Sequence, residues 1–271
     1  MAKSVIAIVA HPDDIEFLFA GTMLQLAAAG YQLHYMALAS GNCGSLDLNA
    51  DETRRVRRSE AERAAEILGA VYHPPLCDDL EIVYSVKMLR CIASVIRATA
   101  PQIVLTHSPD DYMVDHMETA RLAVTAAFTH SMPNFVNEPP TKALSGHRLA
   151  VYHAMPHGLS NGLREPVHPE FYVDTGAVMD TKRAALAAHK SQQEWLDASQ
   201  GMSSFLSTME QMSMDLGRMS GCFAHAEGWR RRLHYGFSNA EYDPMADDLR
   251  GKLVNNPDYH TDTKTDYGSQ T

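Results

Sequence analysis

The stretch SVIAIVAHPDD, residues 4–14, decides how the rest of this sequence is interpreted. Residues 5–9 form an apolar run rich in β-branched side chains, which is typical of a short strand buried on both faces. A histidine, a proline and two adjacent aspartates follow at once. Because neighbouring carboxylates repel each other, either a helix start or a bound cation must stabilise them. We therefore predict a buried strand over residues 4–10 that ends in a polar site.

Beyond this strand, helical and extended patterns alternate. Helical periodicity marks residues 15–29, 52–69, about 85–98 and about 115–128, and apolar runs predict strands over 32–39, 70–73 and 102–106. Gly30 and Gly69 stand where the first two helices should end. Such alternation predicts an α/β fold in which a mostly parallel sheet carries helices on both faces.

The pattern changes after residue 130. Residues 148–154 and 171–175 are typical of strands that extend the sheet, and residues 181–196 of a helix. A methionine-rich segment over 202–219 is expected either to fill irregular gaps in the core or to form a lid. No internal repeat or linker divides the chain. We expect a single domain over residues 1–238, followed by a polar C-terminal tail or arm over 239–271.

Composition and charge exclude several classes of partner. A formal net charge of −10 and the lack of a basic patch argue against nucleic acid. No apolar run approaches the ~20 residues that a membrane span needs, and the first strand follows the N-terminus without a signal-peptide pattern. The four cysteines form no CxxC pair. We expect a cytoplasmic protein that acts on a small molecule, as a homo-oligomer.

A second polar loop, THSPDDYMVDH over residues 106–116, also follows a strand and precedes a helix. If the two strands lie parallel in one sheet, both loops leave its carboxyl edge, where open α/β sheets bind ligands. His11, Asp14 and His116 can then converge. Two imidazoles and one carboxylate suit Zn²⁺, or another divalent metal such as Fe²⁺, and leave a position for water. Asp13, beside the metal, would be placed to accept a proton from that water.

Helix capping is the alternative explanation of the same carboxylates. Asp13 with Glu16, and Asp115 with Glu118, have the spacing of a capping pattern, and their charges suit a helix N-terminus. Capping requires no metal, but it gives the two histidines no role. Both explanations stay open on spacing alone.

Several motifs, taken in order, resemble a known family. They are AHPDDIE (residues 10–16), RRSEAERAAEILG (57–69), Asp115-His116, the spaced set Lys182, His189, Ser191 and Gln192, and AEGWRR (226–231). Together they resemble the PIG-L/LmbE-like zinc-dependent de-N-acetylases. The resemblance implies a Rossmann-like three-layer sandwich with a C-terminal elaboration. It also implies a zinc enzyme that hydrolyses an N-acetyl amide, typically on a glucosamine-containing conjugate.

The resemblance also implies roles for individual residues. By motif position, His11, Asp14 and His116 would be the zinc ligands and Asp13 the general base. Arg57 stands in the place of an arginine associated with substrate binding. These implied roles agree with the site that the two loops predict.

The sequence departs from the family in the second motif, which commonly reads His-Pro-Asp-His and here begins with Met113. The resemblance implies that the leading histidine stabilises an oxyanion or protonates the leaving amine, and a thioether has no proton to donate. His153 or His157 could reach the site from a later loop. Besides Arg57, the candidate substrate-binding residues are therefore Asp115, Met113, His107 and Tyr112.

The sequence therefore predicts metal-assisted removal of an N-acetyl group from an N-acetylglucosamine-like conjugate. One alternative is a related zinc amidase that acts on another N-acyl substrate, such as a thiol conjugate or a secondary metabolite. Another is a metal-containing sugar-binding protein with little turnover. A nucleotide site at residues 40–44, SGNCG, is weakly indicated, because the loop lacks the GxGxxG spacing.

Overall fold

The computed structural model describes residues 3–200 and 205–259, without the side chains of residues 197–200. Its sheet consists of β1 (Ser4–Val9), β2 (Gln32–Ala37), β3 (Ala70–His73), β4 (Ile103–Thr106), β5 (Ala150–Ala154), β6 (Phe171–Asp174), β7 (Ala226–Arg231) and β8 (Leu253–Asn255). The strand order is β3-β2-β1-β4-β5-β7-β6-β8. The first five strands in this order pair in parallel, whereas β7 and β8 run antiparallel to their neighbours. The predicted mostly parallel sheet is confirmed.

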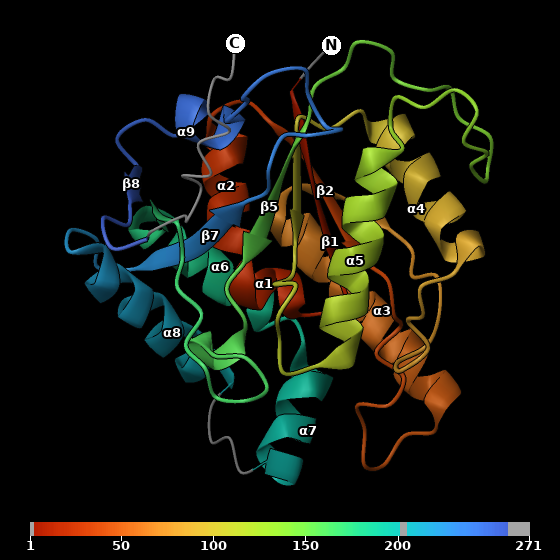
Figure 1. The fold of residues 1–271 in the computed structure, drawn as a ribbon. Coiled ribbons are helices and arrows are strands. Elements are labelled where there is room, and N and C mark those ends of the chain that lie inside the picture. The colour runs from red at the N-terminus through yellow and green to blue at the C-terminus, as the bar shows by residue number, and fades with distance from the viewer. Residues whose placement is uncertain (1–2, 201–204, 260–271) are drawn as a thin grey trace.

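Helices cover both faces of this sheet. They are α1 (Asp14–Leu18), α2 (Ala20–Ala28), α3 (Ala50–Leu68), α4 (Val86–Thr99), α5 (Val114–Phe128), α6 (Met179–Leu186), α7 (Lys190–Gln200), α8 (Phe205–Ser220) and α9 (Pro244–Asp248). Helices α4 and α5 lie on one side, and α2 and α8 on the other (Figure 1). A hydrophobic core lies on each face of the sheet, and alternate residues of β1 point into them. Val5 and Val9 belong to one core, and Ile6 and Ile8 belong to the other. The α/β three-layer prediction is confirmed.

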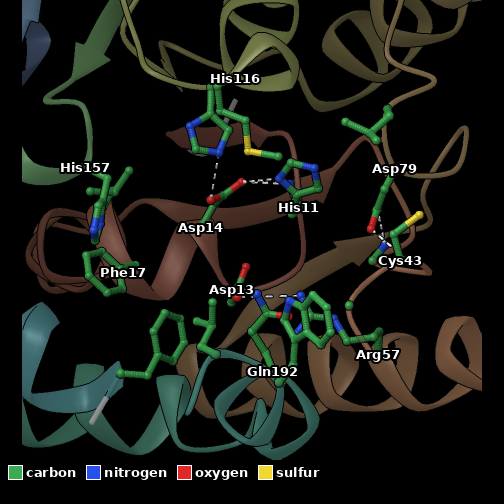
Figure 2. Close-up of a pocket in the computed structure, with 18 of the residues that line it drawn as sticks. His11, Asp13, Asp14, Phe17, Cys43, Arg57, Asp79, His116, His157 and Gln192 are labelled. Atoms are coloured by element: carbon green, nitrogen blue, oxygen red, sulfur yellow. Dashed lines mark hydrogen bonds and ion pairs between the residues drawn. The ribbon is translucent and has the colours of Figure 1, made fainter. Parts of the chain in front are cut away.

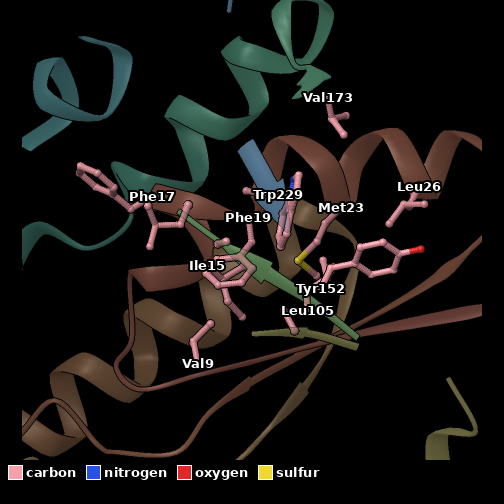
Figure 3. Close-up of a cluster of buried hydrophobic side chains, with 14 of the residues drawn as sticks. Val9, Ile15, Phe17, Phe19, Met23, Leu26, Leu105, Tyr152, Val173 and Trp229 are labelled. Carbon is pink, nitrogen blue, oxygen red and sulfur yellow. The ribbon is translucent and has the colours of Figure 1, made fainter. Parts of the chain in front are cut away.

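Two helices that periodicity predicts as continuous are interrupted. The helix expected over 15–29 breaks at Phe19, whose fully buried ring packs edge-on against Trp229 at a centroid distance of 5.4 Å (Figure 3). The helix expected over 181–196 breaks before Lys190, and the buried His189 lies 3.4 Å from Glu16. In both places a side chain enters the core, and this packing overrides the helical periodicity.

The strand order switches between β1 and β4. Strands β2 and β3 extend the sheet on one side of β1, whereas β4 and β5 extend it on the other side. Val5 is paired with Ile103 and Ile8 with Thr106, so the two strands end at the same edge. The loops after them therefore lie side by side, as predicted. Such a switch point is where open α/β sheets bind ligands.

The C-terminal segment returns to the sheet. Of the tail or arm predicted from residue 239, the described part includes α9 and β8, and β8 pairs with β6 at the sheet edge. Residues 202–204 of the methionine-rich segment lie outside the described residues. In the rest, α8 buries Met209 and Met212 in the core, whereas Met214 and Met219 are exposed. None of the described helices is long and apolar enough to span a membrane.

Candidate metal and active site

The turn after β1 points two adjacent carboxylates in different directions. Asp13 adopts a left-handed backbone with φ 102°, a conformation that aspartate tolerates better than most residues. The His11 backbone N–H donates to Asp14 Oδ2 at 2.7 Å and fixes the turn. Asp14 consequently points toward His11 and His116, and Asp13 lies on the side of Arg57 (Figure 2).

Three side chains converge where the two loops meet. The candidate ligand atoms of His11, Asp14 and His116 all lie within 4.8 Å of one another. His11 Nδ1 is 3.6 Å from Asp14 Oδ2, and His116 Nε2 is 3.4 Å from Asp14 Oδ1. Two imidazole nitrogens thus face one carboxylate from different sides. This donor set suits Zn²⁺ or Fe²⁺ and leaves coordination positions open.

The other nitrogen of each imidazole is held by a further carboxylate. His11 Nε2 lies 3.0 Å from Asp115 Oδ2, and His116 Nδ1 lies 3.1 Å from Asp111 Oδ1. Asp115 also accepts the Leu80 backbone N–H at 2.8 Å. Carboxylates in these positions orient histidines that bind metals and fix their tautomers. The site therefore fits a divalent metal in two respects: in its three candidate ligands and in the carboxylates that orient the two histidines.

The electrostatics of the cluster favour positive charge beside Asp14. Burial lowers the pKa of His11, but hydrogen bonds to Asp115 and Asp14 outweigh it and raise that pKa to about 9. His116 is also buried, yet the charge of Asp14 and the bond to Asp111 raise its pKa to about 10. Burial would raise the pKa of Asp14, but the imidazoles hold it well below its usual range. A bound cation would take the place of these protons.

Asp13 has the environment of a general base. It is 6% exposed, and burial raises its pKa to about 6, although the Arg57 guanidinium opposes this shift. Arg57 Nη2 lies 3.6 Å from Asp13 Oδ2 and donates to the Pro12 carbonyl at 2.5 Å. A base with a pKa close to neutrality is suited to accept a proton from water and release it later.

A cavity of about 360 Å³ opens over these groups. The predicted site residues that line it are His11, Asp13, Asp14, Arg57, Tyr112, Met113 and His116. His157, from the loop after β5, also lines it, near Phe17 in Figure 2. The structure thus brings most of the predicted residues to one place.

His107 and Asp115 are not among the described residues that line the cavity. His107 is fully buried, accepts the Ala10 N–H at 2.9 Å and stacks on His116 with ring centroids 4.0 Å apart. Asp115 lies behind His11, as described above. His153 also lies behind the site, where its Nδ1–H donates to the His107 carbonyl at 2.7 Å. Their contacts are with the cluster, on the side away from the cavity.

The loop of residues 40–44 forms another wall of the cavity. The backbone N–H groups of Gly41 and Cys43 donate to the two Asp79 carboxylate oxygens at 2.7 and 3.0 Å. A phosphate would need these same donors, so the hydrogen bonds argue against the nucleotide site. The sequence analysis assigned no role to Asp79 or Asp111, although each belongs to an Asp-Asp pair and Asp111 lies in the second polar loop, because sequence spacing does not show which backbone N–H or imidazole a loop carboxylate contacts. An apolar wall was also missed; it consists of Phe17, Leu18, Trp195, Leu196 and Phe205.

Comparisons with known proteins identify the family and the fold. Residues 6–127 match the family model described as PIG-L, GlcNAc-PI de-N-acetylase. The chain is 30% identical over 198 residues to the diacetylchitobiose deacetylase of Thermococcus kodakarensis. This match covers 70% of each chain. It is also 27% identical over 205 residues to the 4-oxalmesaconate hydratase of Pseudomonas putida, covering 70% of this chain and 74% of the hydratase.

A solved structure shares the fold. The N,N'-diacetylchitobiose deacetylase of Pyrococcus horikoshii, crystallised with an inhibitor, superposes with a TM-score of 0.71 at 24% identity. The match covers 89% of this chain and 88% of the other.

Proposed function

Because the chain belongs to the PIG-L family of de-N-acetylases, we propose that it hydrolyses the N-acetyl amide of an amino-sugar conjugate. The observation that carries the proposal is the position of Asp13. This buried carboxylate opens onto the same cavity as the cluster of His11, Asp14 and His116. A base beside a metal-binding site is an arrangement that supports hydrolysis of an amide by water.

His11 Nδ1, Asp14 and His116 Nε2 would hold the metal, and zinc is the ion that we propose. When bound, such a metal lowers the pKa of coordinated water and polarises an acyl carbonyl. Asp115 and Asp111 keep the two imidazoles turned toward Asp14.

The remaining residues move protons and bind the substrate. Asp13 accepts a proton from the attacking water while the water oxygen forms a bond to the acyl carbon. The same carboxyl then gives the proton to the nitrogen as the C–N bond breaks. Arg57 Nε and Nη1 have no hydrogen-bond partner among the described residues, so this buried guanidinium has donors left for a substrate oxygen. Because Met113 offers no proton, the oxyanion has no donor from this position.

Hydration of a carbon–carbon double bond is the second candidate. Its support is the 27% identity to the 4-oxalmesaconate hydratase. Asp13 could also take a proton from water in such an addition, and Arg57 could pair with a substrate carboxylate. A related amidase with another N-acyl substrate uses the same residues as the leading proposal. A sugar-binding protein with little turnover is less well supported, because binding alone has no use for a base beside the metal.

The first experiment measures bound metal and released amine in one preparation. Protein purified without added metal is analysed by elemental mass spectrometry and then assayed with N-acetylglucosamine, diacetylchitobiose and an N-acetylated thiol conjugate. We expect one divalent metal per chain and amine release that a chelator abolishes. The Asp14→Asn variant, which loses a ligand, is the matched control. Absence of metal after reconstitution with zinc, or hydration of 4-oxalmesaconate without any amine release, would overturn the proposal.

A further inference from the structure

One side of the active-site cavity is formed by carbon-rich side chains. Phe17 comes from α1, Leu196 from α7 and Phe205 from the start of α8, and all three line the cavity that also holds Asp13. The rings of Phe17 and Phe205 lie 5.3 Å apart. Leu18 and Trp195 complete this apolar wall. In Figure 2, Phe17 lies beside His157, on the side of Asp14 away from His11, and all four residues line the same cavity.

This wall is poorly suited to the hydroxyl groups of a second sugar ring. A hydroxyl placed against phenylalanine and leucine carbons would lose its hydrogen bonds to water, which costs about 1–3 kcal/mol in proteins. Of the polar groups in the cavity lining that could bind sugar oxygens, Arg57 lies beside Asp13, and Gln192 lies one turn before Trp195 and Leu196 on α7, next to the apolar wall. An apolar group, in contrast, gains from leaving water for such a surface.

The size of the cavity points the same way. Its volume of about 360 Å³ is in the range of pockets that enclose whole small molecules, which start at about 300 Å³. An acetyl group bound at the metal cluster fills only a small part of such a space. Residue 113, where the family pattern has histidine, also contributes a methionine thioether to the lining. The cavity therefore has room for more than the acetyl group, and its lining on this side favours carbon over hydroxyl groups.

We propose that Phe17, Leu196 and Phe205 form a subsite for an apolar group of the substrate, adjacent to the amide that is hydrolysed. This inference rests on the proposed function and adds a substrate class to it. The apolar group has two chemical sources: a longer N-acyl chain, or an apolar substituent on the amino sugar. Two series of substrates distinguish them.

The experiment uses the metal-loaded full chain. One series is glucosamine with N-acetyl, N-butyryl and N-hexanoyl groups, and the other is N-acetylglucosamine as its methyl, butyl and hexyl β-glycosides. We expect kcat/KM to rise about two- to fourfold per methylene in one series, which identifies the source. If N-acetylglucosamine is hydrolysed but kcat/KM is flat or falls along both series, the subsite does not exist and the proposed function stands.

Binding is measured as well, so that the subsite can be tested without turnover. Calorimetry with the same compounds should show affinity that rises along one series. If this happens without any amine release, the subsite is supported and the proposed function fails. Equal affinities along both series, without turnover, overturn the subsite as well.

Two variants locate the subsite on the apolar wall. Leu196→Asn and, on the half-buried Trp195, Trp195→Gln place polar groups there. In each variant, the slope of log kcat/KM against the number of methylenes should fall to less than half of its wild-type value. Glu194→Gln, on the exposed side of the same helix, is the matched control and should keep the slope. If both variants fold and keep the wild-type slope, the apolar wall is not the subsite.

Discussion

His11 Nε2 lies 3.0 Å from Asp115 Oδ2, and this contact leaves His11 Nδ1 as the nitrogen that faces Asp14. The sequence analysis places Asp115 among the candidate substrate-binding residues. In the structure this carboxylate is buried behind the imidazole, where it would orient His11 as a candidate metal ligand. The two roles predict different results when Asp115 is changed.

Asp115→Asn should weaken metal binding by about 10- to 100-fold, because an amide orients and polarises the imidazole less well than a carboxylate. The dissociation constant for zinc is measured by competition with a chromophoric chelator. At saturating zinc, we expect KM for the substrate to stay within about twofold. Asp110→Asn, an exposed residue of the same loop, is the control. A raised KM with unchanged zinc affinity would instead make Asp115 a substrate-binding residue.

Asp13→Asn should retain zinc and reduce amine release at least about 100-fold, because an amide cannot accept the water proton. Asparagine tolerates the left-handed backbone at this position as well as aspartate does, so the turn should be preserved. Asp14→Asn provides the contrast, because it should lose both zinc and activity. Near-normal turnover by a zinc-loaded Asp13→Asn variant would exclude Asp13 as the base.

Met113→His should change turnover without changing metal content, because residue 113 lines the cavity but is not among the three candidate ligands. We expect a gain in kcat, since one oxyanion donor is typically worth about 10²–10³ in rate. Met113→Leu, which adds no donor, should behave as the wild type. Loss of zinc from the histidine variant would show that position 113 supports the fold of the site.

The sequence predicted the parts of the structure that depend on local pattern. Short apolar runs marked β1 and β4, and two polar loops marked the edge where they meet. Because neighbouring parallel strands end at the same edge of a sheet, these local signals were enough to predict that His11 and His116 lie close together. The capping explanation of these loops is wrong, because Asp13 makes no side-chain cap hydrogen bond and the N-cap residue of α5 is Met113 rather than Asp115. The family and its class of amide-hydrolysing enzymes, predicted from the motifs, are confirmed by the comparisons.

What the sequence could not show depends on distant packing. Phe19 breaks a regular helical pattern because its ring packs on Trp229, more than 200 residues away. The apolar wall forms only because α7 and α8 are folded back over α1. Asp111 approaches His116 across a turn, where no periodicity marks the contact.

Lys182, a residue of the family-like spacing, forms a buried ion pair with Glu227. Its Nζ donates to Glu227 Oε1 at 2.6 Å, and the same carboxylate accepts the N–H groups of Gly21 and Thr22. Lys182→Met leaves a buried carboxylate without its cation and should lower the free energy of unfolding by about 3–5 kcal/mol in urea titrations. The double variant Lys182→Met/Glu227→Gln should recover part of this loss. A loss below about 1 kcal/mol in the single variant would contradict the assignment.

The free energy of unfolding should fall in acid because of a histidine pair that is not among the described residues lining the cavity. His34 Nδ1 and His73 Nε2 are 3.0 Å apart, and burial, with the neighbouring imidazole, lowers the pKa of His34 from 6.5 to about 4. Below about pH 6.5 the unfolded chain therefore binds more protons at His34 than the folded chain does. The stabilisation is complete above that pH and is lost as the pH falls toward 4.

His34→Gln tests this directly, because glutamine can keep a hydrogen bond to His73 but does not titrate. Between pH 7.5 and 4.5 the wild type should lose about 2–3 kcal/mol more unfolding free energy than the variant in urea titrations. Contributions from groups that do not contact the pair are common to both proteins and cancel in the difference, which therefore reports on His34 together with its effect on His73. His168→Gln, at an exposed position, should follow the wild-type curve. If His34→Gln also follows it, the pair does not set the acid stability of this fold.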